Sequence, residues 1–76
     1  MTFNEAVEEM KRLAGDGVWA LDYEVASYHP AWIHGYIGDV GHAEHSNTYT
    51  GAIANVQTMI AMRHLPGDPA PEEEAA

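Results

Sequence analysis

The sequence predicts a small α+β domain in which two helices pack on one face of an antiparallel β-hairpin. Residues 2–14 place apolar side chains at helical spacing, residues 18–37 alternate with the period of a β-strand, and residues 48–65 return to helical spacing. A chain of 76 residues is long enough for one small core, so residues 1–65 are expected to form a single domain. The remaining stretch, PGDPAPEEEAA at 66–76, is Pro-rich and acidic and is predicted to be a disordered tail.

The first helix is predicted over Thr2–Ala14. Thr2 and Glu5 stand three residues apart, which is the spacing of a capping box at a helix start. Gly15 should end the helix, because glycine readily takes the left-handed conformation found after a last turn. The apolar residues of this stretch share one helix face: Phe3, Ala6, Val7, Met10, Leu13 and Ala14.

Two strands should follow as a hairpin. In the first, Val18–Tyr28, one face carries Trp19, Leu21, Tyr23 and Val25, and the other carries Ala20, Asp22, Glu24 and Ala26. A turn is expected at Tyr28–Ala31, because Pro30 removes a ladder hydrogen-bond donor. The second strand is then expected over Trp32–Ile37.

The second strand has an aliphatic face and a polar aromatic face. The first holds Ile33 and Ile37, and the second holds Trp32, His34 and Tyr36. We assign the aliphatic face to the core, which places the aromatic face on the open side of the sheet, beside Asp22 and Glu24. The opposite assignment is an alternative, because a slip of one residue exchanges the two faces.

Residues 38–46 are predicted to form a loop, or a short third strand around Val40–Glu44. Asn47 or Thr48 should cap the second helix. That helix has a broad apolar side and should end near Leu65, directly before the helix-breaking Pro-Gly pair.

The chain is acidic, with twelve Asp or Glu residues against three Lys or Arg and a formal charge of −9. Four acids lie in the tail, and the remaining eight acids and three bases give residues 1–65 a net charge of −5. So few bases cannot neutralise a nucleic-acid backbone, and the same excess of acids disfavours anionic membrane surfaces. A basic protein or nucleoprotein complex is therefore the expected partner. Acidity that serves only solubility is the alternative.

No cysteine is present, so neither a disulfide nor a thiolate metal site can stabilise this small core. A homodimer would stabilise it by burying additional apolar surface. No apolar run approaches the roughly 20 residues that span a bilayer, and the first residues lack the pattern of a signal peptide. The protein is therefore expected in the cytoplasm, without membrane association.

Candidate partner-binding residues are those expected on the open side of the hairpin and at its turn: Asp22, Glu24, Tyr28, Trp32, His34 and Tyr36. Aromatic side chains dominate interface hot spots, and carboxylates beside them suit Arg or Lys on a partner. The chain is not expected to be an enzyme, because Asp39, His45 and Ser46 show no spacing that fixes a catalytic geometry.

A small metal-binding domain is an alternative function. His42 and His45 stand three residues apart with His34 nearby, and imidazoles are good ligands for zinc or nickel. No second well-spaced ligand pair accompanies them, so no metal or other cofactor is assigned.

Between residues 35 and 60 the chain carries a strand end at Tyr36–Ile37, a turn at Asp39–Gly41, a cap at Asn47–Thr48 and a helix at Ala52–Asn55. In this order the segments resemble HicB-type antitoxin domains. The sequence departs from that family at several positions, including Gly51, which stands where the family has a glutamate. The resemblance implies a compact domain that blocks a toxin ribonuclease by binding it.

Two further likenesses bear on function. The element order is similar to that of the double-stranded-RNA-binding domain, but Thr48–Gly51 lacks the basic residues that begin that family's last helix, so RNA binding is rejected. A short, acidic, cysteine-free chain with no enzyme motif also resembles phage-encoded anti-defence proteins, including anti-CRISPR proteins. The predicted function is a non-catalytic inhibitor that masks a basic, nucleic-acid-handling surface of a partner, as an anti-defence protein or an antitoxin. A structural, self-assembling subunit is a further alternative.

Overall fold

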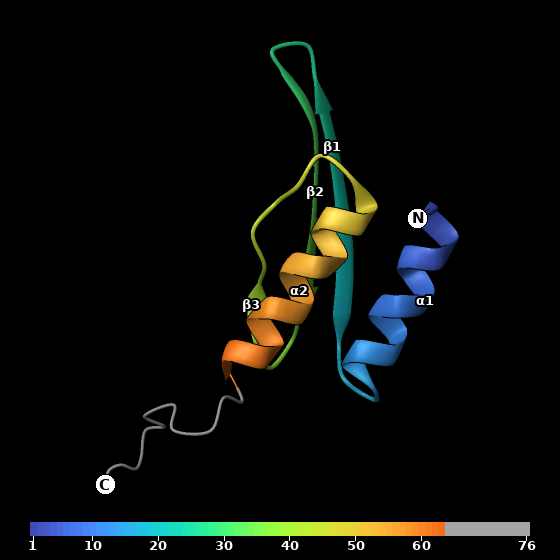
Figure 1. Cartoon of the computed structure of the whole chain (residues 1–76), viewed down its shortest axis with the longest axis vertical. Coiled ribbons are helices and arrows are strands. Elements are labelled where there is room, and N and C mark those ends of the chain that lie inside the picture. The colour runs from blue at the N-terminus through green and yellow to red at the C-terminus, as the bar shows by residue number, and fades with distance from the viewer. Residues whose placement is uncertain (64–76) are drawn as a thin grey trace, which may run out of the picture.

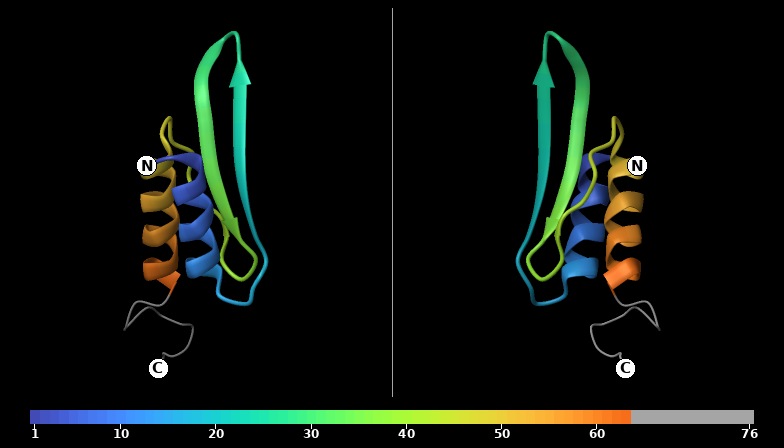
Figure 2. Two further views of the ribbon diagram at one scale, coloured as in Figure 1. Left: turned by 90° about the vertical axis from the view of Figure 1, so that its right-hand side faces the viewer. Right: turned by 90° about the vertical axis from the view of Figure 1, so that its left-hand side faces the viewer.

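The fold consists of two helices and a three-stranded antiparallel sheet, seen in a computed structural model that describes residues 1–63 (Figure 1). The elements are α1 (Phe3–Ala14), β1 (Trp19–Ala26), β2 (His29–Ile37), β3 (Gly41–His42) and α2 (Tyr49–Arg63). The strand order is β1-β2-β3, and both helices pack on the same face of the sheet (Figure 2). The predicted α+β class is therefore confirmed. The predicted tail at 66–76 and the predicted helix end near Leu65 lie outside the described residues.

Helix α1 begins and ends where its capping residues predict. The Thr2 side chain accepts a hydrogen bond from the Glu5 backbone at 3.2 Å, and the Thr2 backbone donates to Oε1 of Glu5 at 2.7 Å. Gly15 has a φ of 61° and donates its N–H to the Lys11 carbonyl at 3.1 Å. Ala6 and Met10 are the fully buried residues of this helix, so its apolar face meets the sheet.

The aliphatic face of β2 forms the centre of the core. Ile33 is 2% exposed and Ile37 is 6% exposed, and Gly35 between them is also buried. A Cβ atom at Gly35 would lie 2.5 Å from Cγ2 of Val56 and 3.0 Å from Cε of Met10. Only a glycine lets both helices approach the sheet this closely. The assignment of the aliphatic face to the core is confirmed.

The turn of the hairpin is shorter than predicted. It lies at Ser27–Tyr28, and β2 already begins at His29, so the expected turn at residues 28–31 is wrong. The pairing steps from Glu24 opposite Trp32 to Ala26 opposite His29, which leaves one extra residue in β2. This β-bulge contains Pro30, and a bulge is a position where a strand tolerates a missing N–H donor.

The hairpin projects beyond the helices, so its far end is not covered by them (Figures 1 and 2). Trp19 and Leu21 pack against the core, but Tyr23 and Val25, further along the same face of β1, are 56% and 66% exposed. The prediction of one continuous buried face on this strand therefore holds only for its first half.

A short third strand is present, as one of the two interpretations of residues 38–46 proposed. β3 pairs His42 with Tyr36, and a further bridge joins Ser46 to Ile33. Thr48 caps α2, because its side chain accepts a hydrogen bond from the Gly51 backbone at 3.0 Å. Neither helix in residues 1–63 has the length and apolar character needed to cross a membrane.

Candidate functional site

The open face of the sheet, defined as the side turned away from both helices, gathers most of the predicted site residues. It is formed by Asp22 and Glu24 of β1, His29, Trp32, His34 and Tyr36 of β2, and His42 of β3. Asp22 lies directly opposite His34, and Glu24 lies directly opposite Trp32. Five of the six predicted partner-binding residues therefore share one surface. The sixth, Tyr28, lies in the hairpin turn and is 83% exposed.

Four aromatic side chains form a row at the projecting half of this face. The His29 ring stacks on Trp32 with centroids 3.8 Å apart and an interplanar angle of 6°. The His45 ring covers Trp32 at 4.6 Å, and Tyr28 meets His29 edge-on at 4.9 Å. We call Tyr28, His29, Trp32 and His45 the aromatic row. It presents flat, rigid rings, which lose little conformational entropy when a partner packs against them.

His29 is a site residue that the sequence analysis missed. Strict alternation along β2 would place it on the side opposite Trp32, since the two residues are an odd number of positions apart. The bulge at Pro30 and Ala31 shifts the alternation by one residue, so His29 and Trp32 lie on the same face. The Pro30 that suggested a turn is thus the signal that could have indicated a bulge.

Hydrogen bonding fixes the His29 ring in place. Nδ1 lies 2.6 Å from the Pro30 carbonyl oxygen, to which it donates. Nε2 is buried without a hydrogen-bond partner, and it faces Oε2 of Glu24 at 3.4 Å. The His29 side chain is only 9% exposed, whereas that of Glu24 is 58% exposed. Glu24 therefore lies beside the aromatic row with its carboxylate open to solvent.

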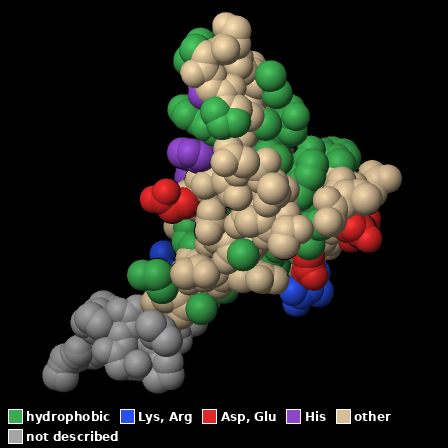
Figure 3. Space-filling model, turned by 45° about the horizontal axis from the view of Figure 1, so that its top comes forward, with side chains coloured by type: hydrophobic (Ala, Val, Ile, Leu, Met, Phe, Trp, Pro, Cys, Tyr) green, Lys and Arg blue, Asp and Glu red, His purple; other side chains and the backbone are tan. Residues whose placement is uncertain are grey.

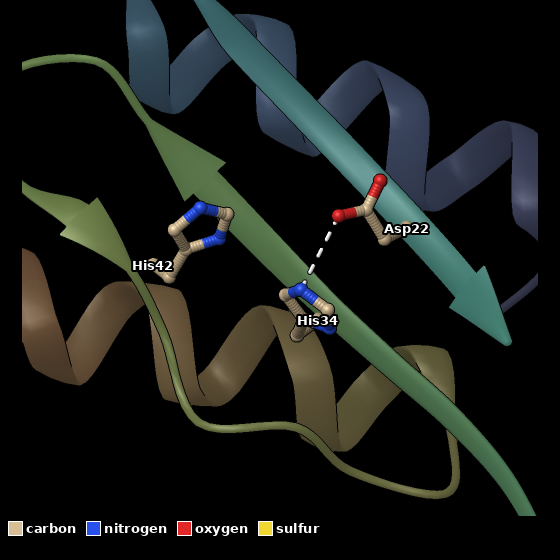
Figure 4. A group of neighbouring side chains, drawn as sticks. All are labelled: Asp22, His34 and His42. Carbon is tan, nitrogen blue, oxygen red and sulfur yellow. Dashed lines mark ion pairs between the residues drawn. The ribbon is translucent and has the colours of Figure 1, made fainter.

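A second group lies at the middle of the open face. Nε2 of His34 is 3.2 Å from Oδ2 of Asp22, and the rings of His34 and His42 are 5.5 Å apart (Figure 4). Tyr36 packs against His42 at 4.7 Å. Within residues 1–63, Asp22, His34 and His42 are the group whose ligand atoms lie close enough together to hold a metal ion.

The histidines named as alternative metal ligands take two different places. His34 and His42 belong to the group with Asp22, whereas the ring of His45 lies on Trp32 in the aromatic row. Ser46, which was considered for catalysis, pairs its backbone with Ile33 at 2.7 Å and 2.8 Å and holds the chain at the start of α2. Its place is explained by strand pairing.

The charges of the molecule are divided between the sheet and the helices. Residues 15–48, which form the sheet and its connections, contain five acids and no Lys or Arg. The basic residues lie on the helices, where Lys11 pairs with Glu8 at 3.3 Å and Arg12 pairs with Glu9 at 2.8 Å. Figure 3 views the helix side, and the basic side chains in view there lie away from the projecting hairpin. Of the five acids, Asp22 and Glu24 lie on the open face, beside its aromatic side chains.

A second exposed apolar surface lies on the helix side of the projecting hairpin. Tyr49 stacks on Tyr23 at 6.1 Å and meets Phe3 edge-on at 5.9 Å. Phe3 and Tyr23 are each more than half exposed. Both were expected on buried faces, and Tyr23 is exposed because it lies on the part of the hairpin that extends beyond the helices.

Together the fold and the open face define a class of protein. It is a small α+β domain that presents an acidic, aromatic and histidine-rich sheet surface. No protein-family model, curated protein or solved structure matches the chain. The likenesses to HicB-type antitoxin domains and to phage anti-defence proteins therefore stay predictions.

Proposed function

We propose that this chain is a non-catalytic inhibitor that binds a basic, nucleic-acid-handling protein or nucleoprotein complex through the open face of its sheet. The observation that carries the proposal is the separation of charge. Asp22 and Glu24 lie on the open face, residues 15–48 contain no Lys or Arg, and the basic residues lie on helices behind the sheet. A partner surface rich in Lys and Arg complements such a face and is steered toward it.

The aromatic row supplies the anchor that charge alone does not provide. Trp32 lies between two imidazole rings, and Tyr28 extends the row to the exposed turn. Buried aromatic side chains contribute most of the binding energy in many interfaces, and their faces also attract Arg and Lys. Glu24, directly opposite Trp32, would place a carboxylate beside such a cation.

An inhibitor of this kind needs no catalytic group, since it acts by covering the surface on which its partner holds nucleic acid. The two biological settings that fit are an anti-defence protein of the anti-CRISPR type and an antitoxin. In either setting the partner would be met in the cytoplasm, which is the location we propose.

The test is a pull-down with the immobilised chain at low and at high salt, followed by a nucleic-acid-binding assay with the purified partner. We expect salt-sensitive capture of a basic protein that loses nucleic-acid binding when the chain is added. Failure to capture such a protein, or capture of one that still binds nucleic acid fully, would contradict the proposal.

A matched pair of variants locates the interface. Trp32→Ala combined with Glu24→Lys should abolish binding, because it removes the anchor and reverses a charge on the open face. Glu8→Lys makes the same change of charge on exposed α1, and it should leave binding nearly unchanged. Circular dichroism of each variant separates lost binding from lost folding.

Self-assembly is a second candidate, favoured by the position of β1. This strand of eight residues is an edge of the sheet and its second half is largely exposed, so its backbone could pair with that of a second copy. Light scattering over a concentration series tests it, and a monomer at every concentration would exclude this function.

A further inference from the structure

We infer that Asp22, His34 and His42 form a binding site for a divalent transition metal ion, with zinc as the expected occupant. The three side chains come from three adjacent strands and lie on the same side of the sheet (Figure 4). One ligand atom from each lies within 4.8 Å of the others. This inference does not rest on the proposed function, because metal binding is measured on the isolated chain.

The spacing of the ligand atoms suits zinc. Zinc bonds nitrogen and oxygen at about 2.0–2.2 Å, so two ligands of a tetrahedral site lie roughly 3.3 Å apart. Nε2 of His34 and Oδ2 of Asp22 are already 3.2 Å apart. His42 is exposed, so its ring can turn toward the pair without disturbing the core.

The sheet register, rather than chance proximity, holds the third ligand. A contact between Asp22 and His34 is what any cross-strand acid–histidine pair would show, since the two lie directly opposite one another. His42 joins them because β3 pairs with the end of β2, opposite Tyr36 and diagonal to His34. The backbone register of the three strands therefore places these three residues at neighbouring positions before any metal binds.

The donor set selects the class of ion. Two imidazoles and one carboxylate favour zinc, nickel or copper over calcium or magnesium, which prefer oxygen ligands alone. Three protein ligands leave at least one position for water or for a group from another molecule. The side chains of Asp22 and His34 are 55% and 30% exposed, so an ion can enter from solvent.

The surrounding charge favours a cation at this place. Residues 15–48 contain no Lys or Arg, so no basic side chain of the sheet or its connections competes for Asp22. A bound ion would also tie β3, which is only two residues long, to the other two strands. Binding to the folded state alone stabilises it by RT ln(1 + [metal]/Kd), so the melting temperature rises with the logarithm of the metal concentration.

The experiment is a calorimetric titration of tag-free, chelator-treated protein with Zn²⁺, paired with melting curves with and without Zn²⁺. We expect one Zn²⁺ per chain and a higher melting temperature with zinc. Loss of a side chain that only supports a metal ligand weakens binding by roughly 10–100-fold. Because His42 is proposed as a direct ligand, His42→Ala should weaken Zn²⁺ binding by more than that. It should also remove most of the rise in melting temperature.

His45→Ala is the matched control, because His45 lies close to His42 in sequence but stacks on Trp32. It should bind Zn²⁺ like the wild type. Co²⁺ provides a second readout, since its visible absorption is strong only in a tetrahedral site, and His34→Ala should remove that absorption. If the wild type binds no stoichiometric Zn²⁺, or if His45→Ala weakens binding as much as His42→Ala, the inference is wrong. If His34→Ala does not fold, the comparison of His42→Ala with His45→Ala decides alone.

Discussion

The side-chain amide of Asn55, in α2, donates a hydrogen bond of 3.0 Å to the backbone carbonyl of Glu44, in the connection between β3 and α2. The same nitrogen lies 3.4 Å from the carbonyl oxygen of His45. One helix residue thus holds the connection that follows β3 and carries His45 to Trp32. A contact on the helix side of the sheet therefore helps to position a residue of the aromatic row on the other side.

Asn55→Ala should loosen this connection. The loss of a side-chain hydrogen bond to a solvent-accessible carbonyl destabilises a protein by about 1 kcal/mol, although the better helix propensity of alanine offsets part of this. The amide of Ser46, which donates to Ile33, should exchange with solvent faster. Denaturant unfolding and hydrogen exchange measure both effects.

Gln57→Ala is the control for Asn55→Ala, because Gln57 is an exposed amide side chain on the same helix. It should change neither the exchange of Ser46 nor, beyond a few tenths of a kcal/mol, the stability. Equal effects of the two variants would show that Asn55 does not hold the loop.

Gly35→Ala should destabilise the fold by about 1–3 kcal/mol, which is typical of overpacking a core. The new Cβ would lie 2.5 Å from Cγ2 of Val56, so α2 must move away from the sheet. Gly38→Ala is the matched control, since a Cβ there would meet Val18 no closer than 3.4 Å. Urea unfolding of both variants measures the difference. A Gly35→Ala variant as stable as Gly38→Ala would mean that the helices do not approach the sheet this closely.

Local sequence signals predicted the parts of the fold that depend on neighbouring residues. The capping box of Thr2 and Glu5 and the stop at Gly15 defined α1, because each acts over three or four residues. The alternation around Ile33 and Ile37 identified the buried face of β2 for the same reason. These features need no knowledge of the rest of the chain.

The features that the sequence did not predict depend on contacts between distant segments. Nothing local shows that the hairpin extends beyond the helices, so Tyr23 was expected in the core although it is 56% exposed. The bulge that carries His29 to the open face depends on pairing with β1. Likewise, sequence spacing paired His42 with His45, whereas strand register brings His42 to Asp22 and His34.

Thr2→Ala should destabilise the domain by about 1 kcal/mol, because it removes the side chain that accepts the Glu5 N–H at the start of α1. Thr58→Ala is a control, since Thr58 is an exposed threonine inside α2. It should be neutral or slightly stabilising, as alanine is the better helix former. Thermal unfolding of the two variants checks this, and a loss of stability no greater for Thr2→Ala than for Thr58→Ala would rule out a capping contribution.

Gly51→Ala should be destabilising although it replaces a glycine inside a helix, where alanine is usually more stable by up to about 1 kcal/mol. A Cβ at position 51 would overlap Oγ of Ser46 and lie 3.0 Å from Cβ of Ser46. Ser46 cannot move away easily, because its backbone pairs with Ile33. The close approach of Ser46 to α2 therefore gives a steric reason for glycine at position 51.

A double-mutant cycle tests this explanation of Gly51. In a Ser46→Gly background the obstructing side chain is gone, so Gly51→Ala should become neutral or stabilising. The coupling between the two positions should fall in the range of about 0.5–3 kcal/mol that contacting residues show. Urea unfolding of the four proteins gives that coupling. If Gly51→Ala has the same effect with and without the Ser46 side chain, the close approach of Ser46 to α2 is not what requires glycine at position 51.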